Sequence, residues 1–380
     1  MPTRHGWTLL VAAAATFVVA RLFGLIELYV LGSALVAMVL VSLAVVNRAL
    51  PALTVRRIAR PSMVSVGEPA RVDIQVANSG GRRSPRLKLW EPVGARGGAP
   101  MQLAPLSPGD AATAAYRVPS GRRGVLRIGP LRAERSDPLG LCQRADLIAG
   151  SGEVLVVPER VPLSFPGLSS NGRLGEHLRM KSWGQTGTEF HSQREYVPGD
   201  DLRRINWKSS ARAGDLIVRE TAVEGVRRCV VALDTMQIEY DEDGFERAVV
   251  AAASIVAGAA ALGINTRLVA PGIDLRGPDV AHDSLRWLAT VQPGNELVDH
   301  AAAGRTHGDG LGLLVMVTGR ARSAALATAK ASVAPDETLV TVLVSEPPSA
   351  GSRFSVDGTS LASLQSGWNQ LVLGHQVVTV

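Results

Sequence analysis

The densest group of ionisable side chains in this 380-residue chain lies between residues 187 and 220. The stretch holds five arginines, one lysine and six carboxylates around the turn Pro198-Gly199-Asp200-Asp201, with Trp207 near its middle. Unpaired charges cost too much to be buried, so these groups must pair with one another or face a partner. In the first alternative, arginines form bidentate pairs with the carboxylates, Trp207 packs over them, and the network locks a turn. In the second, the stretch is a docking surface, because Arg and Trp are favoured anchors of protein interfaces.

These charges are not accompanied by a pattern typical of catalysis. Ser209 and Ser210 have no histidine near them in the sequence, and His191 is isolated. The chain also lacks a Gly-x-Ser-x-Gly elbow and a phosphate-binding glycine loop. Cys142 and Cys229 are far apart and have no metal-ligand spacing. We therefore expect a protein that is not an enzyme, with no cofactor, no metal and no disulfide.

A short helix should position the charged stretch. The pattern predicts a helix that is N-capped by Asp200 or Asp201, runs to about Ala211 and ends at Ala213-Gly214. A strand should begin at Leu216. We treat residues 161–225 as a separate motif segment.

Two apolar runs open the chain. Leu25–Val46 is apolar apart from Glu27 and exceeds the roughly 20 residues that a bilayer needs. Trp7–Ala20 reaches a comparable length if it continues to Phe23, with Arg21 at the interface. No small-residue cleavage site separates the runs, so residues 1–50 are expected to form a transmembrane helical hairpin rather than a signal peptide.

Charge suggests how the hairpin lies in the membrane. Residues 48–160 hold 18 Arg and Lys against 9 Asp and Glu, whereas residues 161–380 hold 20 against 24. Basic residues flank the hairpin at both ends, so the positive-inside rule places the soluble domains in the cytoplasm of a two-helix membrane protein. The basic middle region is either a solvated strand face or a surface for anionic lipid headgroups. Nucleic acid is not expected as a partner, because no interleaved aromatic residues accompany the charge.

The remainder reads as two folded domains. Residues 51–160 alternate polar and apolar residues between Gly- and Pro-rich turns, which predicts an antiparallel β-sandwich-like domain. Turns are expected at Asn78–Gly81, as part of a hairpin, and at Asp137–Gly140. Residues 226–380 alternate apolar strands with helical stretches, which predicts an α/β domain with a parallel sheet covered on both faces. Its strand ends at Asp234 and at Thr318 are where ligands of such folds bind.

The charged stretch resembles the bacterial domain-of-unknown-function 58 family. The resemblance rests on Glu189-Phe190, Arg194-Glu195-Tyr196, Pro198-Gly199-Asp200-Asp201, Arg203-Arg204-Ile205-Asn206-Trp207 and Ala211-Arg212. It implies a membrane hairpin, a β domain, the motif and a domain similar to von Willebrand factor A. It also implies a MoxR-type AAA+ ATPase and a transglutaminase-like membrane protein as partners. The residues it marks, for docking or for structure, are Arg194, Tyr196, Asp200, Asp201, Arg203, Trp207 and Arg212.

The von Willebrand comparison bears on metal binding. Metal-binding members carry Asp-x-Ser-x-Ser after the first strand, whereas Met236 and Ile238 stand here in place of the two serines that follow Asp234. Their later Thr-Asp-Gly is replaced by Thr318-Gly319-Arg320. Asp234 and Thr318 are therefore expected to be remnants of a metal site. The acidic residues 239–243 could bind cations loosely, although a solvated loop is expected instead.

Together, these patterns favour a non-enzymatic, membrane-anchored adaptor that is a partner or client of a MoxR-type ATPase. Two alternatives stay open at this point. One is an envelope-assembly scaffold that binds other membrane proteins, and the other is a divalent-ion-dependent binding module.

Overall fold

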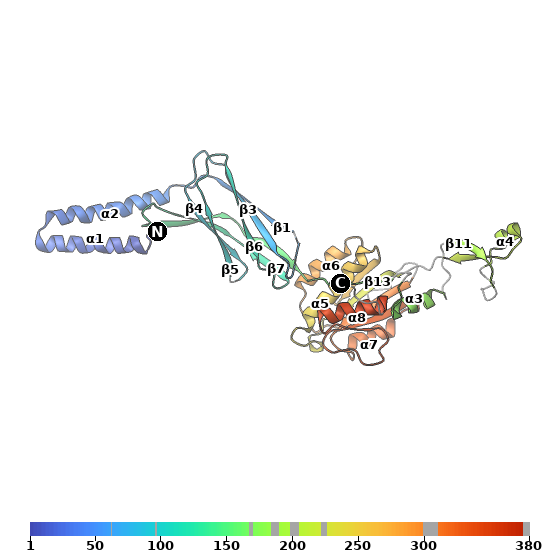
Figure 1. Cartoon of the computed structure of the whole chain (residues 1–380). Helices are drawn as coiled ribbons and strands as arrows, with labels where there is room; N and C mark the ends of the chain where they lie inside the picture. The colour runs from blue at the N-terminus through green and yellow to red at the C-terminus, as the bar shows by residue number, and fades with distance from the viewer. Residues whose placement is uncertain are drawn as a thin grey trace. The chain divides into compact units, whose positions relative to one another are not determined.

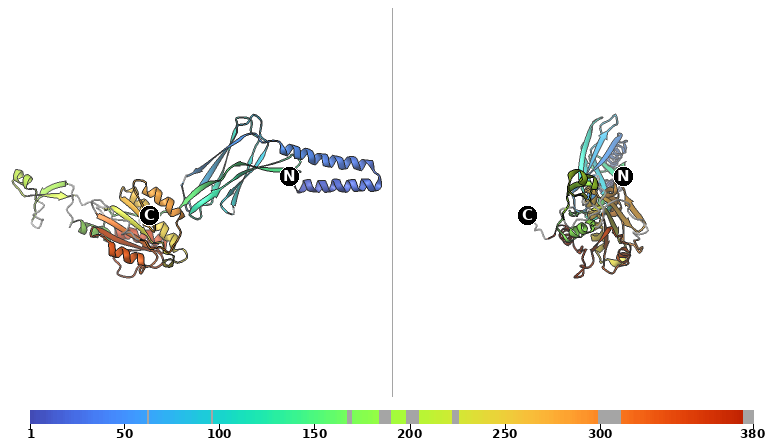
Figure 2. Two further views of the ribbon diagram at one scale, coloured as in Figure 1. Left: turned by 180° about the vertical axis from the view of Figure 1, so that it is seen from behind. Right: turned by 90° about the vertical axis from the view of Figure 1, so that its right-hand side faces the viewer.

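The computed structural model describes residues 1–61, 63–95, 97–166, 170–183, 190–197, 205–221, 226–298 and 311–374 (Figure 1). These residues form two compact units, Met1–Val157 and Pro158–Val380. Two apolar helices open the chain, and sheet-rich domains with mixed α/β content follow them (Figures 1 and 2).

The first unit begins with a helical hairpin made of α1 (Arg4–Phe23) and α2 (Ile26–Asn47). Gly24 ends α1 in the left-handed region, at φ 66°, which lets the chain reverse within two residues. The helices approach closely at Gly32, where an added Cβ would lie 2.9 Å from the ring of Phe17. Both helices are long and apolar enough to span a membrane. A third such helix among the described residues, α5 (Gly244–Ala261), instead packs against a sheet in the second unit.

The open end of the hairpin is docked onto the turn between β8 (Leu131–Ser136) and β9 (Gln143–Ala149). Leu141 and Cys142 form one buried cluster with Val39 and Val46 of α2. The Thr3 amide donates to the Leu141 carbonyl at 2.8 Å. Gly6 lies so close to that carbonyl that a side chain there would clash with it. The contacts make the hairpin and the β domain one body.

Two sheets face each other in the β domain. Among the described residues, β1 (Leu53–Arg60), β3 (Ala70–Asn78) and β6 (Ala111–Val118) form the first sheet. The second sheet contains β8 and β9 together with β2 (Met63–Ser65), β4 (Leu87–Val93), β5 (Gly97–Leu103), β7 (Gly124–Ile128) and β10 (Gly152–Val157). Pairing is antiparallel except between β2 and β10. The core consists of the alternate residues that each sheet turns inward, for example Ile74 and Leu89.

The structure differs from the expected turns at one point. Asn78–Gly81 leads from β3 in one sheet to β4 in the other, so the expected hairpin there is wrong. The Asn78 side chain explains the different path, because its amide donates to the carbonyls of Arg82 and Leu106 and holds the chain as it crosses between sheets. The turn at Asp137–Gly140 forms as expected, and the Gly140 amide donates to the Asp137 carbonyl at 3.0 Å.

A charged pair bridges the two sheets inside the core. Arg57 on β1 donates through Nε to Oε1 of the fully buried Glu91 on β4, at 2.5 Å. Tyr116 on β6 lies beside them, and its burial together with the Glu91 carboxylate raises its pKa well above the usual range. Gly129 makes room for the pair, because a Cβ there would lie 2.9 Å from the Arg57 guanidinium.

The second unit is built on a six-stranded sheet of the described residues in the order β15-β14-β13-β16-β17-β18. Its strands are β13 (Val226–Leu233), β14 (Asn265–Ala270), β15 (Ile273–Arg276), β16 (Leu311–Thr318), β17 (Glu337–Leu343) and β18 (Ser355–Asp357). All pairings are parallel except that of β15 with β14.

Helices cover this sheet. The helix α5 contacts β13 and β14, and it packs against α6 (Val280–Thr290). On the other face, α7 (Ala324–Ser332) packs on Val230 and Met316 of the sheet. The helix α8 (Leu361–Leu373) buries Trp368, whose Nε1 donates to the Ser164 carbonyl at 2.5 Å. It also contacts α3 (Arg173–Trp183). The fold is therefore the expected α/β arrangement with a mainly parallel sheet, and α3, β15, β18 and α8 are elements that the sequence pattern did not predict.

We expect the Arg57–Glu91 pair to be needed for the stability of the β domain. Arg57→Ala should lower the free energy of unfolding by about 3–5 kcal/mol, because it leaves a buried carboxylate without its counter-charge. Chemical denaturation of the full chain measures this, and Arg57→Met combined with Glu91→Leu should recover most of the loss.

The matched control is Arg71→Ala, because Arg71 is 63% exposed in its ion pair with Asp73. That change should cost about 1 kcal/mol or less. A cost for Arg57→Ala as small as that of the control would contradict the prediction.

Candidate functional site

The first candidate site is formed by a strand pair and a short helix. The strands β11 (Phe190–Glu195) and β12 (Ile217–Thr221) pair antiparallel, and α4 (Trp207–Ala213) precedes β12. Asn206 caps α4 by accepting from the Ser209 amide at 3.3 Å, and Gly214 ends it at φ 83°. The Ser210 hydroxyl accepts from the Ile217 amide at 2.8 Å, which fixes the helix to the strand.

This helix is shorter than the sequence predicts, and its cap is a different residue. Ile205 pairs with Val218 in a β-bridge, and the Asn206 amide donates to the Ile217 carbonyl at 2.7 Å. The backbone before Trp207 is therefore held against β12 and is not available to a helix. The expected cap by Asp200 or Asp201 is wrong for α4.

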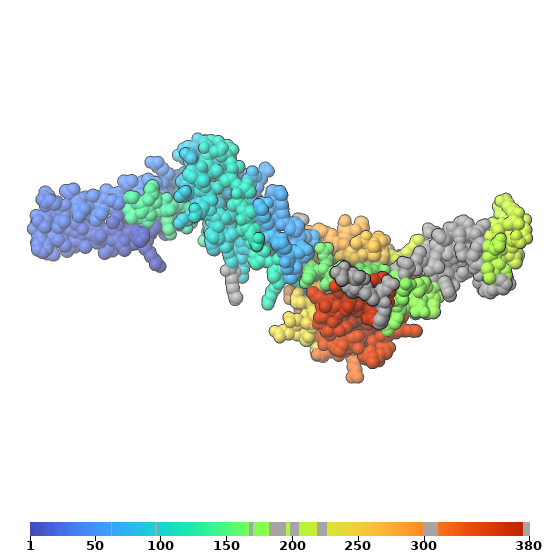
Figure 3. Space-filling model, viewed as in Figure 1, coloured from blue at the N-terminus to red at the C-terminus, as the bar shows by residue number. Residues whose placement is uncertain are grey.

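Apolar and cationic side chains are exposed on α4 and on the residues that flank the strand pair β11–β12. Trp207 is 66% exposed, Val197 57% and Leu216 42%. Lys208 and Arg212 are also exposed. We call these five residues the α4 surface, and the segment that contains α4 is yellow-green in Figure 3. Ile205 and Val218 form the small buried side beneath it.

The structure accounts for part of the sequence-predicted motif. Trp207 and Arg212 lie together on α4, and Tyr196 is half-buried, with its amide donating to the Leu216 carbonyl at 2.7 Å. The charged pairs over which Trp207 would pack in the turn-locking alternative involve side chains outside the described residues, so that alternative stays a prediction. Asp200, Asp201 and Arg203 lie outside the described residues, as does the side chain of Arg194.

The second candidate site lies where two neighbouring strands end. Asp234 follows β13 and Thr318 ends β16, and both are fully buried. Since β13 and β16 are adjacent and parallel, their ends meet at the point where the strand order reverses. The sequence thus correctly brings Asp234 and Thr318 to one edge of the sheet.

The hydrogen bonds of Asp234 are all internal. The Thr318 hydroxyl donates to one carboxylate oxygen at 2.8 Å, and the Met236 amide donates to the other at 3.0 Å. The Tyr240 hydroxyl donates to the Asp234 backbone carbonyl. Burial raises the pKa of Asp234, and the hydrogen bonds from the Met236 amide and the Thr318 hydroxyl only partly oppose that rise.

The surroundings of Asp234 do not fit a hard cation. Met236 offers no hard oxygen ligand from its side chain, and the Ile238 side chain is 72% exposed. Gly319 lies against the Glu239 carbonyl so closely that any side chain there would clash with it. An aspartate at that position has no room, and no group of three metal-ligating side chains exists among the described residues.

Among the acidic residues that follow, Asp241 is paired within the protein. Arg247 binds both carboxylate oxygens of Asp241, at 2.6 and 2.7 Å, and donates to the Val344 carbonyl. This hydrogen-bonded guanidinium holds the pKa of Asp241 below its usual range. Burial raises the pKa of Glu239, and the neighbouring Asp234 raises it further. No sequence pattern indicated the roles of Arg247 and Tyr240, because their partners are set by the loop after β13.

Comparison with protein families identifies the region that holds both sites. Residues 192–272 match the family described as "Protein of unknown function DUF58". We call these residues the DUF58 segment. It contains the whole α4 surface as well as Asp234, Tyr240 and Arg247, whereas Thr318 lies beyond it.

No curated protein matches the chain. Among solved structures, the chain is similar to the CARDB domain of the PF1109 protein from Pyrococcus furiosus, with 19% identity, 29% of this chain and 94% of that chain covered, and a TM-score of 0.22. It is also similar to the ApaA protein from Bordetella pertussis, with 12% identity, 27% and 93% coverage, and a TM-score of 0.21. A β-glucosidase from Listeria innocua matches at 14% identity, with 29% and 16% coverage and a TM-score of 0.20.

Asp234 and Asp241 should respond to pH in opposite directions. The pKa of Asp234 is raised in the folded state. Its burial therefore lowers the stability of the wild-type protein only when the pH exceeds the unfolded-state pKa of about 3.9. Asp234→Asn should therefore gain stability relative to wild type as pH rises from about 4 to 7. Asp241→Asn should lose stability relative to wild type as the pH rises toward about 4, because the stabilisation from the lowered pKa of Asp241 is lost as the pH falls through its folded pKa and is complete above the unfolded pKa.

Thermal denaturation at several pH values checks both variants. Asp234→Ala should cost about 1–3 kcal/mol, because it leaves the buried Thr318 hydroxyl and Met236 amide without their acceptor. Added Mg²⁺ should leave the melting temperature of wild type unchanged. A stabilisation by Mg²⁺ that Asp234→Asn abolishes would show that the site binds the ion after all.

Proposed function

We propose that the protein is a non-enzymatic, membrane-anchored adaptor that captures a partner protein through the α4 surface. The observation that carries the proposal is the exposure of Trp207 beside Lys208 and Arg212, within the DUF58 segment. The Trp207 side chain is 66% exposed, so its apolar surface is in contact with water unless a partner covers it. At protein interfaces, Trp and Arg side chains contribute most of the binding energy. The two cations call for an acidic patch around the pocket that accepts the indole.

The anchor in this proposal is the α1–α2 hairpin. Arginines follow α2 on β1, and this supports a cytoplasmic position for both folded units. A cytoplasmic, ATP-driven partner is then accessible to the α4 surface. We propose a MoxR-type AAA+ ATPase as that partner, with a transglutaminase-like membrane protein as a further member of the assembly, because the resemblance to the DUF58 family implies both.

We further propose that the α/β domain is similar to von Willebrand factor A and acts as a binding domain without a metal ion. The strand order of its sheet, with the antiparallel edge strand β15, supports the likeness. The closed surroundings of Asp234 support a metal-independent role and weigh against the divalent-ion module. Ser210 is engaged by the Ile217 amide, which also weighs against a nucleophile in the DUF58 segment.

Crosslinking in native membranes tests the proposed partner. Wild type should recover a MoxR-type ATPase, and Trp207→Ala should weaken its binding by about 2 kcal/mol, or roughly 30-fold, because a central aromatic anchor is lost. Arg212→Glu should also weaken the binding, because the acidic patch of the partner would repel the new negative charge. Quantitative mass spectrometry of the crosslinked material provides the measurement.

Arg286→Glu is the matched control, because Arg286 is an exposed arginine on α6 of the same unit, away from α4. It should recover the ATPase as wild type does. Equal recovery with all three variants would remove the α4 surface from the interaction, and absence of any ATPase with wild type would overturn the adaptor. Recovery of envelope proteins alone would favour the assembly scaffold.

A single cysteine should report the side of the membrane. Both native cysteines are fully buried, so they should not react with a maleimide in the folded protein. Ser107→Cys places a thiol on an exposed loop of the β domain. A membrane-impermeant maleimide should label it only after the membrane is permeabilised, while wild type stays unlabelled throughout. Labelling of Ser107→Cys in intact cells would place the β domain outside the cytoplasm.

A further inference from the structure

The connection between β17 and β18 leaves part of the sheet without a helix. The segment after β13 contains α5, and α7 lies between β16 and β17. Residues 344–354, which join β17 to β18, contain only bends and turns. Crossovers between parallel strands are right-handed, so a helix in this connection would lie on the same face as α7. Because the connection contains no helix, no helix from it covers the face of β17 beside α7.

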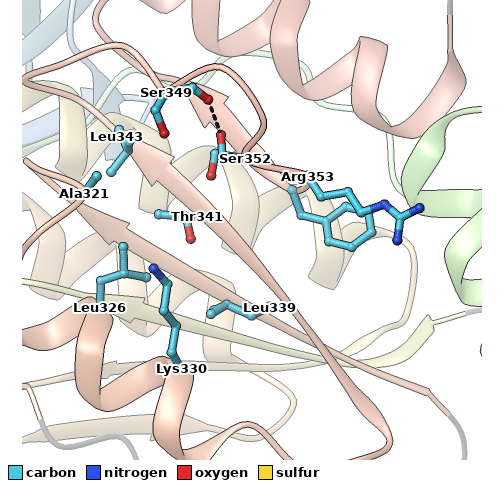
Figure 4. Close-up of a pocket in the computed structure, with 11 residues that line it drawn as sticks. Ala321, Leu326, Lys330, Leu339, Thr341, Leu343, Ser349, Ser352 and Arg353 are labelled. Atoms are coloured by element: carbon cyan, nitrogen blue, oxygen red, sulfur yellow. Dashed lines mark hydrogen bonds between the residues drawn. The ribbon is translucent and has the colours of Figure 1, made fainter.

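A pocket of about 290 Å³ occupies this position (Figure 4). Its floor consists of alternate residues of β17, namely Leu339, Thr341 and Leu343. The other walls are α7, with Leu326 and Lys330, and the loop before β18. Polar groups from that loop and from β18 also line the pocket: Ser349, Ser352 and Ser355.

One cation faces this space. Lys330 extends from α7 toward Thr341, whereas the guanidinium of Arg353 points away from the other labelled side chains (Figure 4). Among the described residues, Lys330 has no ion-pair or hydrogen-bond partner. Lys330 is an exposed residue on α7, and its ammonium extends over apolar and hydroxyl-bearing side chains of the pocket.

The carboxylates of the neighbourhood already have hydrogen-bond or ion-pair partners within the protein. Asp336 pairs with Arg228. Glu337 accepts from the Ala334 amide at 3.3 Å, and Glu346 accepts from the Ala321 amide at 2.7 Å. None of these bonds needs to break for a ligand to bring its own negative charge to Lys330.

We propose that this pocket binds a small amphipathic carboxylate. Its carboxylate would pair with Lys330 and accept from the serine and threonine hydroxyls, and its apolar body would cover Leu326, Leu339 and Leu343. A single negative charge on the ligand matches Lys330, the one cation that extends toward the other labelled side chains of the pocket. A volume of about 290 Å³ corresponds to about ten waters at roughly 30 Å³ each, so a ligand of about ten non-hydrogen atoms fills it. The site is separate from the α4 surface and does not depend on the adaptor role.

The probe for the test is 6,6,6-trifluorohexanoate, followed by ¹⁹F NMR with the full chain in lipid nanodiscs. We expect saturable binding to wild type. Lys330→Met keeps the aliphatic stem but removes the charge, and it should weaken binding at least tenfold. Lys88→Met removes a charge from an exposed strand position in the other unit and should bind as wild type does.

Two further measurements separate the pocket from general partitioning into lipid. Ser349→Trp should abolish binding by filling the pocket without a change of charge, while the melting temperature stays as in wild type. The amine 6,6,6-trifluorohexylamine should not saturate, because Lys330 repels it. The proposal would be overturned by any of three results: wild type does not bind trifluorohexanoate, Lys330→Met binds it as tightly as wild type does, or the amine binds as tightly as the carboxylate.

Discussion

The position of the β domain relative to the α1–α2 hairpin depends on one contact, the joint between the hairpin and the β8–β9 turn. Leu141 and Cys142 pack between residues of α2, and Arg135 on β8 donates to the Arg48 carbonyl at 2.6 Å, just beyond the end of that helix. A helix end without partners would leave carbonyl groups unsatisfied, and Arg135 supplies a donor there. The β domain is therefore seated on the hairpin rather than tethered to it by a loose linker. A tilt of the helices in a bilayer moves the whole sandwich.

Sequence patterns predicted the elements of this protein better than their connections. Strands of the sandwich and of the parallel sheet are visible because period-2 alternation and continuous apolar runs both follow from which faces are buried. The predicted hairpin at Asn78–Gly81 and the predicted first residue of α4 were wrong, because a residue distant in the sequence determines each structure. Asn78 binds Leu106, and Ile205 pairs with Val218. The hairpin joint likewise unites residues 87 or more positions apart, which no local pattern encodes.

The two candidate sites were predictable to different degrees. Asp234 and Thr318 meet because parallel strands that are neighbours end at one edge, and this follows from the order of elements alone. Trp207 and Arg212 were identified by residue type, but their exposure could not be read from the sequence. The pocket beside Lys330 was not predicted at all, because it results from a helix that the β17–β18 connection lacks. A missing element leaves no periodic signal.

The contact between Gly319 and the Glu239 carbonyl constrains what substitution can achieve at the end of β13. Serines at positions 236 and 238 would supply oxygen atoms, yet an aspartate at position 319 would have to displace the backbone of the 3₁₀ turn formed by Gln237–Glu239. The course of the main chain thus limits which side chains this edge of the sheet can carry. A substitution that adds any side chain at position 319 would therefore require the loop after β13 to move first.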